Sequence, residues 1–340
     1  MKPARCGFCR HLYSPEKFAS FLQILCPQCQ HPLGLNKNHP ETVVPPFTVS
    51  PELLQGTLFG HYEIIDRIDE GGMAILYWAY HKNIKGDFAL KILKPQESHE
   101  VYEEDILRFY HEFRSASKLN HPHIIKVYEA GLIKNLHFFS MELLSGYSVA
   151  DLLAEQHQLT EAESLRLVIP IAQALQHAHK KKVYHRDIKP ENILFREQNV
   201  PILTDFGLAQ DEKLDQRLSE SGFTLGTPDY MSPEQALSKP CGPEADIYSL
   251  GVVLYELVSG KVPYPGKDPH EIMDKVVHGQ PIPLDHVATV SPLYQQMVMK
   301  CIAKKPVLRY RKMKGLLEDL QRLEQGKPLQ LGKSRFRFFA

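Results

Sequence analysis

The feature that most constrains the fold of this chain is a change in sequence pattern after Asp151. From residue 61, the chain first has short runs rich in β-branched and aromatic residues, which predict strands at 62–68, 75–81 and 88–93. One later stretch, 103–119, has apolar residues at helical spacing. After Asp151, helical patterns dominate, at 151–157, 161–182, 244–260, 269–278, 291–302 and 313–324. A small β-rich half followed by a larger helical half predicts an α+β protein with two lobes and a ligand cleft between them.

The composition excludes several classes of protein. With 43% hydrophobic and 24% charged residues over 340 positions, the chain can bury a sizeable core and is not globally disordered. Forty Lys and Arg balance forty Asp and Glu, so a nucleic acid or an anionic membrane would need a local basic patch. The sequence has no apolar run of about 18 residues and no signal-peptide pattern at the N-terminus. We therefore expect no membrane span and a cytoplasmic location.

Two cysteine pairs lie in the first 35 residues, Cys6 with Cys9 and Cys26 with Cys29, and 16 residues separate the pairs. This spacing is typical of structural zinc, which takes two thiolates from each pair. The pattern predicts a zinc-ribbon-like module over residues 1–35, because so short a segment needs a metal to fold. The alternative is four unrelated free thiols. Residues 36–60 contain four prolines and no helical or strand period, which indicates a linker.

Six motifs follow one another in a fixed order along the rest of the chain. They are a Gly-containing turn over 68–77, FALK ending at Lys91, a helix bearing Glu112, YHRDIKPENIL over 184–194, DFG over 205–207 and GTPDYMSPE over 226–234. On these residues, the chain resembles the protein kinase family over roughly 61–325. The resemblance implies the bilobal protein kinase fold, with an N-lobe over about 61–143, a C-lobe over about 144–325 and a tail over 326–340.

The resemblance gives four polar residues catalytic roles in phosphoryl transfer. Lys91 would bind the α- and β-phosphates of ATP, and Glu112 would hold Lys91 in place. Asp187 would accept the proton of the substrate hydroxyl or orient that hydroxyl. Lys189 would neutralise the phosphoryl group as it moves.

A magnesium ion is implied together with ATP. Asn192 and Asp205 match the family's metal ligands, and their side chains offer the hard oxygen atoms that magnesium prefers. Without a metal, Asp187 and Asp205 would repel the triphosphate.

The resemblance also predicts an adenine pocket and two structural contacts. The residues of the pocket are Ile68, Leu76, Ala89, Met141, Glu142, Leu144 and Leu194. Glu142 and Leu144 would offer backbone hydrogen bonds, and core packing explains the apolar members equally well. Glu234 with Arg309 matches the family's buried ion pair, and Asp246 matches the residue that steadies the loop around Asp187.

The Gly-containing turn departs from the family pattern G-x-G-x-x-G-x-V. The chain has Asp69 and Ala74 in place of the outer glycines, while Gly71 and Gly72 complete the predicted ATP-binding set. A carboxylate about 4 Å from a phosphate would cost about 1 kcal/mol in water and more where water is excluded. We therefore expect Asp69 to raise the KM for ATP.

A regulatory switch is predicted from Arg186, which precedes Asp187. A phosphate on the segment 205–234 could pair with Arg186, and the candidate acceptors are Ser219, Ser221 and Thr224. The alternative is that these hydroxyls are ordinary solvated loop residues. Thr227 is predicted to contact the substrate.

Lys189 and Thr227 resemble the serine/threonine branch of the family. The chain is therefore expected to phosphorylate Ser and Thr of protein substrates, including its own activation segment in trans. The alternative is a pseudokinase scaffold that holds nucleotide and transfers little phosphate. Asp69 favours that alternative, whereas the complete set of Asp187, Asn192 and Asp205 opposes it. The basic residues of the cysteine module are too sparse to indicate a nucleic-acid partner.

Overall fold

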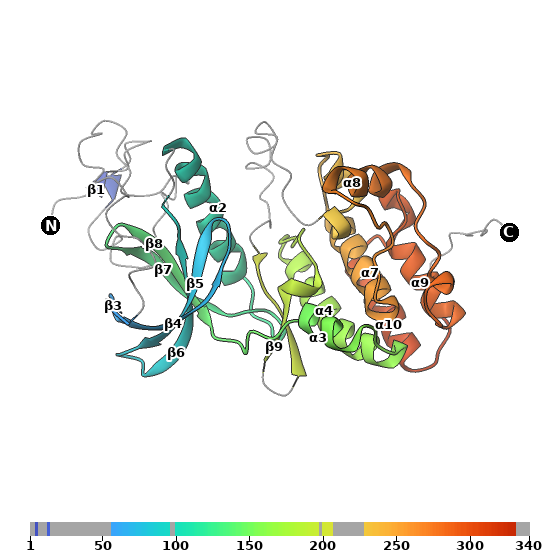
Figure 1. Ribbon diagram of the computed structural model, residues 1–340, viewed down its shortest axis with the longest axis horizontal. Coiled ribbons are helices and arrows are strands. Elements are labelled where there is room, and N and C mark those ends of the chain that lie inside the picture. Colours follow the sequence, from blue (N-terminus) through green and yellow to red (C-terminus); the bar gives the residue numbers. More distant parts are fainter. Residues whose placement is uncertain are drawn as a thin grey trace. The chain divides into compact units, whose positions relative to one another are not determined.

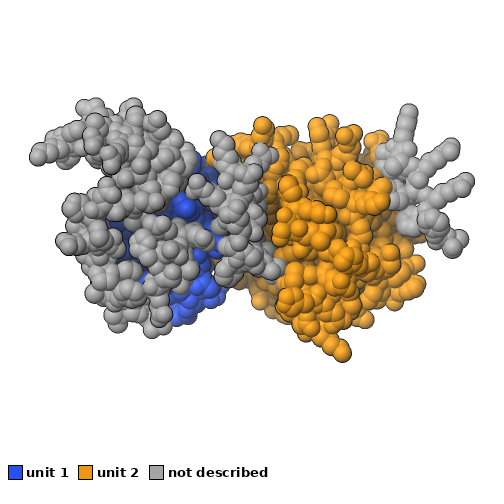
Figure 2. Space-filling view, turned by 90° about the horizontal axis from the view of Figure 1, so that it is seen from above, with its two compact units in different colours: residues 1–117, 125–143 blue, residues 118–124, 144–340 orange. Residues whose placement is uncertain are grey.

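The computed structural model describes residues 4–5, 12–13, 56–95, 99–196, 199–206 and 228–330. These residues belong to two compact units, which Figure 2 colours separately and which are described here one at a time. Unit 1 comprises residues 1–117 and 125–143, and unit 2 comprises residues 118–124 and 144–340.

Unit 1 contains a six-stranded antiparallel sheet with the strand order β3-β4-β5-β6-β8-β7 (Figure 1). Its strands are β3 (Leu58–Phe59), β4 (Tyr62–Glu70), β5 (Ala74–His81), β6 (Gly86–Leu93), β7 (Val127–Ile133) and β8 (Leu136–Glu142). The three strands predicted from the sequence correspond to β4, β5 and β6. Strand β3 lies inside the segment expected to be a linker. Two residues are too few to show a period of two, and Phe59 is fixed by edge-to-face packing on Phe138.

The two faces of this sheet bury separate apolar clusters. One cluster includes Tyr77, Leu90 and Phe138. The other includes Phe139 and the buried face of helix α2 (His99–Ser117), which matches the helical pattern predicted over 103–119. Because side chains alternate along a strand, Phe138 and Phe139 lie on opposite faces. Both faces are therefore buried, and this explains the near-continuous apolar runs of β5 and β6.

Strands β7 and β8 were not predicted. They form a hairpin whose two connecting residues, Lys134 and Asn135, have positive φ angles of 49° and 62°. Positive φ at both central residues is typical of the tight hairpin turns that favour Asn and Gly. Lys-Asn is a weaker signal than Asn-Gly, so the sequence gives little indication of this turn.

Unit 2 is mainly helical. Its α-helices are α3 (Val149–Gln156), α4 (Glu161–Lys180), α6 (Pro233–Ala236), α7 (Pro243–Ser259), α8 (Pro269–His278), α9 (Pro292–Cys301) and α10 (Met313–Glu324). Its two described strands, β9 (Ile193–Arg196) and β10 (Val200–Leu203), pair with each other, and short 3-10 turns include η4 (Pro190–Asn192), η8 (Pro228–Tyr230), η9 (Leu284–His286) and η10 (Pro306–Leu308). All helices predicted after Asp151 are present to within two residues at each end. Capping explains this agreement: Thr160 and Glu163 form a capping box at the start of α4, and Gly260 ends α7 with a φ of 65°.

Helix α7 lies at the centre of unit 2. Nearly all of its residues are buried, which is the expected property of a helix that is packed on every side. Gly251 is required there, because an added Cβ would lie 2.4 Å from the Cβ of Cys301 on α9. One charged residue of this helix, Asp246, has an exposed fraction of 0%.

Several predicted features lie outside the described residues. They are the cysteines Cys6, Cys9, Cys26 and Cys29, the hydroxyl residues Ser219, Ser221, Thr224 and Thr227, and most of the linker and of the tail. In the N-terminal region, the structure describes only the pairing of β1 (Ala4–Arg5) with β2 (Leu12–Tyr13). Of the helices that the structure describes, none combines the length and the apolar character needed to cross a membrane.

Candidate active site

In unit 1, Lys91 and Glu112 form a close ion pair. The Nζ atom of Lys91 lies 2.6 Å from the Oε1 atom of Glu112, and Glu112 is 5% exposed. Lys91 is on β6 and Glu112 is on α2, whose neighbouring apolar residues pack on the same sheet face. The ammonium group also lies 5.6 Å from the centroid of the Phe139 ring. A buried carboxylate and a packed stem thus hold the ammonium group in one position.

The strand register places several predicted nucleotide-binding residues on one face of the sheet. Leu76 pairs with Lys91 across β5 and β6, and Ala89 pairs with Met141 across β6 and β8. Since residues two apart on a strand share a face, all four lie on the face that carries Lys91. Ala89 is buried, whereas Leu76 and Met141 are half-buried. These residues therefore form an apolar surface beside an ammonium group.

The predicted phosphate-binding turn joins β4 to β5. The N–H of Gly71 donates to the carbonyl of Ala74 at 2.9 Å. An added Cβ at Gly72 would meet nothing within 4 Å among the described residues, and at Gly71 it would meet only the Ala74 oxygen at 3.7 Å. Neither glycine is therefore required by the packing of this turn. Glycine at these positions instead leaves the backbone open to close approach from outside.

The acidic residues of this turn differ in their contacts. Asp69 is exposed, and its Oδ1 atom accepts the N–H of Glu70 at 2.7 Å. Glu70 forms ion pairs with Arg67 and with Lys94. The carboxylate of Asp69 is therefore held at the turn by the backbone. Ile68, just before it, is 41% exposed.

In unit 2, Asp187, Lys189 and Asn192 form one cluster. The side-chain amide of Asn192 donates to the backbone carbonyl of Asp187 at 2.8 Å and to its Oδ2 atom at 3.0 Å. The Nζ atom of Lys189 lies 3.3 Å from the same Oδ2 atom. A carboxylate with two such donors is held in a fixed orientation.

Asp205 is brought to this cluster through the residue before it. The backbone carbonyl of Asn192 accepts the N–H of Thr204 at 2.9 Å and its hydroxyl at 3.2 Å. Asp205 is exposed and has a positive φ of 56°, a conformation uncommon outside glycine. Asn192 and Asp205 therefore lie on neighbouring segments of the chain.

A buried carboxylate anchors the loop that carries Asp187. Asp246 accepts three hydrogen bonds, from Nε2 of His179 at 2.6 Å, from the N–H of His185 at 2.9 Å and from the N–H of Arg186 at 2.7 Å. Burial alone would raise the pKa of Asp246, but the hydrogen bond and charge of His179 and the other donors hold it below its usual value. Arg186 has a φ of 65°, so these bonds also hold the backbone in an unfavourable conformation.

His185 is a residue of this site to which the sequence analysis gave no role. Its Nδ1 atom accepts the N–H of Asp187 at 3.3 Å, and its Nε2 atom lies 2.7 Å from the carbonyl of Thr204. These partners fit the neutral ring with the proton on Nε2. The ring also packs against Phe206 at 4.7 Å between centroids. His185 thus connects the loops of Asp187 and Asp205, and its position two residues before Asp187 was the available signal.

Arg186 is buried, and its guanidinium group contacts the chain near α7. Its Nη2 atom donates to the carbonyl of Cys241 at 2.6 Å, and its own carbonyl accepts the side-chain amide of Gln235 at 2.8 Å. The predicted pairing of Arg186 with a phosphate depends on residues outside the described part of the chain.

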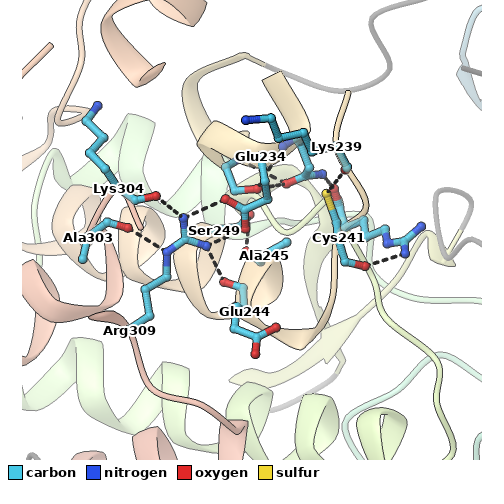
Figure 3. A network of polar contacts seen from close by, with 12 residues as sticks. Glu234, Lys239, Cys241, Glu244, Ala245, Ser249, Ala303, Lys304 and Arg309 are labelled. Atoms are coloured by element: carbon cyan, nitrogen blue, oxygen red, sulfur yellow. Dashed lines mark hydrogen bonds and ion pairs between the residues drawn. The ribbon is translucent and has the colours of Figure 1, made fainter. Parts of the chain in front are cut away.

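Glu234 and Arg309 form the expected buried ion pair. Two guanidinium nitrogens of Arg309 lie 2.6 and 2.8 Å from the two carboxylate oxygens of Glu234, in a bidentate arrangement. Figure 3 shows that the same guanidinium group also reaches the carbonyls of Ala303, Glu244 and Lys304. The pair joins α6 to the chain between η10 and α10, so it stabilises unit 2.

The side-chain oxygens of Asn192 and Asp205 in unit 2 suit a magnesium ion. The amide nitrogen of Asn192 is committed to Asp187, which leaves the amide oxygen as the atom that could bind a cation. The exposed carboxylate of Asp205 offers a second hard oxygen atom. Within the described residues, no group of three or more His, Cys, Asp or Glu side chains could hold a metal ion. A magnesium site need not contain such a group, because magnesium takes few protein ligands and keeps several waters.

The remaining predicted residues are divided between the units. Glu142, at the end of β8, belongs to unit 1, and its N–H donates to the carbonyl of Lys126 at 2.8 Å. Leu144 and Leu194 are half-buried and belong to unit 2. Leu194 lies on β9 and bridges to Ser148.

Comparison with known proteins matches this chain to one family. The description "Protein kinase domain" matches residues 62–319. A probable serine/threonine-protein kinase of Clostridium perfringens is 32% identical over 272 residues, which is 79% of this chain and 39% of the relative. Serine/threonine-protein kinase PrkC of Bacillus subtilis is 32% identical over 79% of this chain and 41% of the relative. PknB of Mycobacterium leprae is 31% identical over 81% of this chain and 45% of the relative. The chain thus aligns with about two fifths of the length of these relatives.

Proposed function

Because this chain belongs to the protein kinase family, we propose that it is an ATP- and magnesium-dependent kinase that phosphorylates Ser and Thr in proteins. The observation that carries this proposal is the cluster of Asp187, Lys189 and Asn192. Buried Asp246 holds the loop of this cluster by accepting the N–H groups of His185 and Arg186. Phosphoryl transfer requires groups that position two oxygen atoms and neutralise charge, and these are the groups of the cluster.

In the proposed reaction, Asp187 accepts or orients the proton of the attacking hydroxyl. Its carboxylate is held by Asn192 and Lys189, so little reorganisation is needed during transfer. Lys189 neutralises the γ-phosphoryl group as its bond to the β-phosphate breaks. The ammonium group of Lys91, fixed by Glu112, binds the α- and β-phosphates.

Asn192 and Asp205 would hold magnesium, which supplies positive charge against the phosphates when it is bound. The face of the sheet with Leu76, Ala89 and Met141 would bind adenine. Gly71 and Gly72 would let the backbone approach the phosphates. For the N-terminal segment, we propose structural zinc at Cys6, Cys9, Cys26 and Cys29. We also propose a cytoplasmic location, because a reducing compartment keeps cysteines available as metal ligands.

Self-phosphorylation in trans is proposed as the route of activation. A phosphate at Ser219, Ser221 or Thr224 would provide charge-assisted acceptors for Arg186. This requires Arg186 to exchange its contact with the carbonyl of Cys241.

A second candidate function is a nucleotide-binding scaffold without transfer activity. The observation that favours it is the exposed carboxylate of Asp69 at the phosphate-binding turn. Repulsion there would weaken ATP binding without removing any of the groups that carry out transfer.

The test is to incubate the purified protein with Mg-ATP beside an Asp187→Asn control and to map the incorporated phosphate by mass spectrometry. Phosphate on Ser or Thr in the wild type alone supports the kinase. Nucleotide binding with no incorporated phosphate in either protein would favour the scaffold.

A further inference from the structure

Unit 2 brings together two segments that lack acidic residues. Residues 118–124 and residues 164–186 contain no Asp or Glu, whereas the whole chain has equal numbers of acidic and basic residues. The second segment includes three exposed lysines in a row. Lys180 is the last residue of α4, and Lys181 and Lys182 follow it. Lys118 in the first segment is exposed as well.

Printed contacts join the two segments into one surface. The Nζ atom of Lys181 donates to the carbonyl of Lys118 at 2.5 Å. The ring of His121 lies 5.4 Å from that of His177 and 5.7 Å from that of His123, measured between centroids. We call this surface the basic face. The residues joined by contacts are Lys118, Lys181, His121, His123, His177 and Arg196, and we include Lys180 and Lys182, the exposed chain neighbours of Lys181.

The backbone fixes two further members of the basic face. Arg196, on β9, donates from Nη1 to the carbonyl of Pro122 at 3.1 Å. The Nδ1 atom of His123 lies 2.9 Å from the carbonyl of Pro201, which fits a donating Nδ1–H. These contacts hold the rings and the guanidinium group in place before any partner binds.

Two histidines of the basic face, His121 and His177, have a lowered pKa. Burial, and then the charges of His123 and His177, lower the pKa of His121 to about 4. Burial, and then the charges of Lys181 and Lys180, lower the pKa of His177. Lys180 and Lys181 therefore lie close enough to His177 to act on its charge, which places these lysines on the same surface as the rings.

We propose that the basic face is a docking site for an acidic segment of a partner polypeptide. Lysines and imidazoles offer N–H donors to carboxylates, and the described residues of the face supply several such donors on one side of unit 2. Single-stranded nucleic acid is favoured less, because its binding sites combine basic residues with aromatic rings that stack on bases. The basic face contains Lys, Arg and His and no Phe, Tyr or Trp. This proposal is independent of phosphoryl transfer, since none of these residues belongs to the proposed active site.

The experiment measures binding of a fluorescein-labelled, glutamate-rich peptide to the full chain by fluorescence anisotropy. The test variant combines Lys180→Gln, Lys181→Gln and Lys182→Gln. The matched control combines Lys267→Gln, Lys312→Gln and Lys327→Gln, which are exposed lysines elsewhere in unit 2 with the same total charge. We expect the test variant to weaken binding about tenfold and the control to weaken it less than about twofold.

A second variant with only Lys180→Gln and Lys182→Gln keeps the contact between Lys181 and Lys118, in case the triple variant is poorly folded.

Three results would overturn the proposal. They are the absence of peptide binding to the wild type, an equal loss of binding in the test and control variants, and tighter binding of a labelled oligonucleotide than of the peptide at equal probe charge. The last result would identify the face as a nucleic-acid site.

Discussion

The two units position their proposed functional residues in different ways. In unit 1, Lys91 and Glu112 lie on a regular strand and a regular helix, and one ion pair joins them. In unit 2, Asp187 lies in a loop whose shape depends on Asp246, a carboxylate from a distant part of the sequence. Substitutions in unit 1 should therefore change activity more than stability, whereas substitutions at Asp246 in unit 2 should lower both.

The largest effect is expected for Asp246→Asn. The amide nitrogen would face either the N–H of Arg186 or the donors of His179 and His185, so a fully buried hydrogen-bonding site would lose one of its two acceptor oxygens. We expect the free energy of unfolding to fall by about 3 kcal/mol or more, together with the rate of transfer. Denaturant unfolding and phosphate incorporation measure the two effects.

The matched control for this variant is Asp319→Asn. Asp319 is also 0% exposed, and it accepts the hydroxyl of Tyr310 at 2.9 Å and the N–H of Gln330 at 2.6 Å. Both partners lie outside the proposed active site. Asp319→Asn should destabilise the protein and leave transfer per folded molecule unchanged. Equal loss of transfer in both variants would contradict the anchoring role of Asp246.

The second prediction concerns Lys91→Met in unit 1. Removing a preorganised cation from the phosphates should lower kcat/KM by about 10²- to 10³-fold. The variant removes the ammonium partner of buried Glu112 and so costs some stability. Folding should still suffer less than with Asp246→Asn, because the Lys91 side chain is 19% exposed and Asp246 is fully buried. Steady-state kinetics with a peptide substrate provides the measurement. Lys82→Met, which removes an exposed partner of Glu63, is the control and should change kcat/KM little.

The third prediction is a pH dependence of stability that arises in unit 1. Burial lowers the pKa of His137 to about 4 and so favours the neutral ring, whose Nδ1 atom lies 2.8 Å from the hydroxyl oxygen of Tyr110. That hydroxyl group donates its proton to the carbonyl of Gly131 at 3.0 Å. The contribution of His137 to stability is complete above the unfolded pKa of about 6.5 and is lost as the pH falls toward 4. Unfolding at about pH 5 should therefore cost about 2 kcal/mol less than at about pH 7.5.

The variant His137→Gln isolates this contribution. It removes the titrating group while keeping a polar side chain opposite Tyr110. The difference in unfolding free energy between the two pH values should shrink in the variant. An undiminished difference would assign the pH dependence to other groups, such as His121 in unit 2, whose pKa burial also lowers.

The smallest effect is expected for Asp69→Gly. The carboxylate is exposed, so water screens its repulsion of ATP. We expect the KM for ATP to fall by about fivefold, which corresponds to about 1 kcal/mol, with kcat unchanged. An unchanged KM would remove the argument for a weakened nucleotide site in unit 1.

The parts of the fold that follow a regular period could be predicted from the sequence. Helices α4 and α7 have the capping residues Thr160 and Gly260, and α10 has apolar residues at helical spacing. Strands β7 and β8 could not be predicted in this way, because their hairpin depends on positive φ angles at Lys134 and Asn135. Strand β3 is too short to show any period.

The candidate site was predicted through its motifs. Asp187, Asn192 and Asp205 were identified because they stand in a recognised order, and the structure brings them together through Thr204. The contacts of His185 could not be derived in this way. They depend on which carbonyl lies opposite each ring nitrogen, and that is a property of the folded chain.

The most direct test of the central claim compares nucleotide affinity with phosphate transfer in the wild type and in Asp187→Asn. The account predicts similar affinity for Mg-ATP in both proteins, measured by calorimetry, and transfer to Ser or Thr that falls by about 10²-fold or more in the variant. Equal transfer in the two proteins, or none in a wild type that binds Mg-ATP, would contradict it.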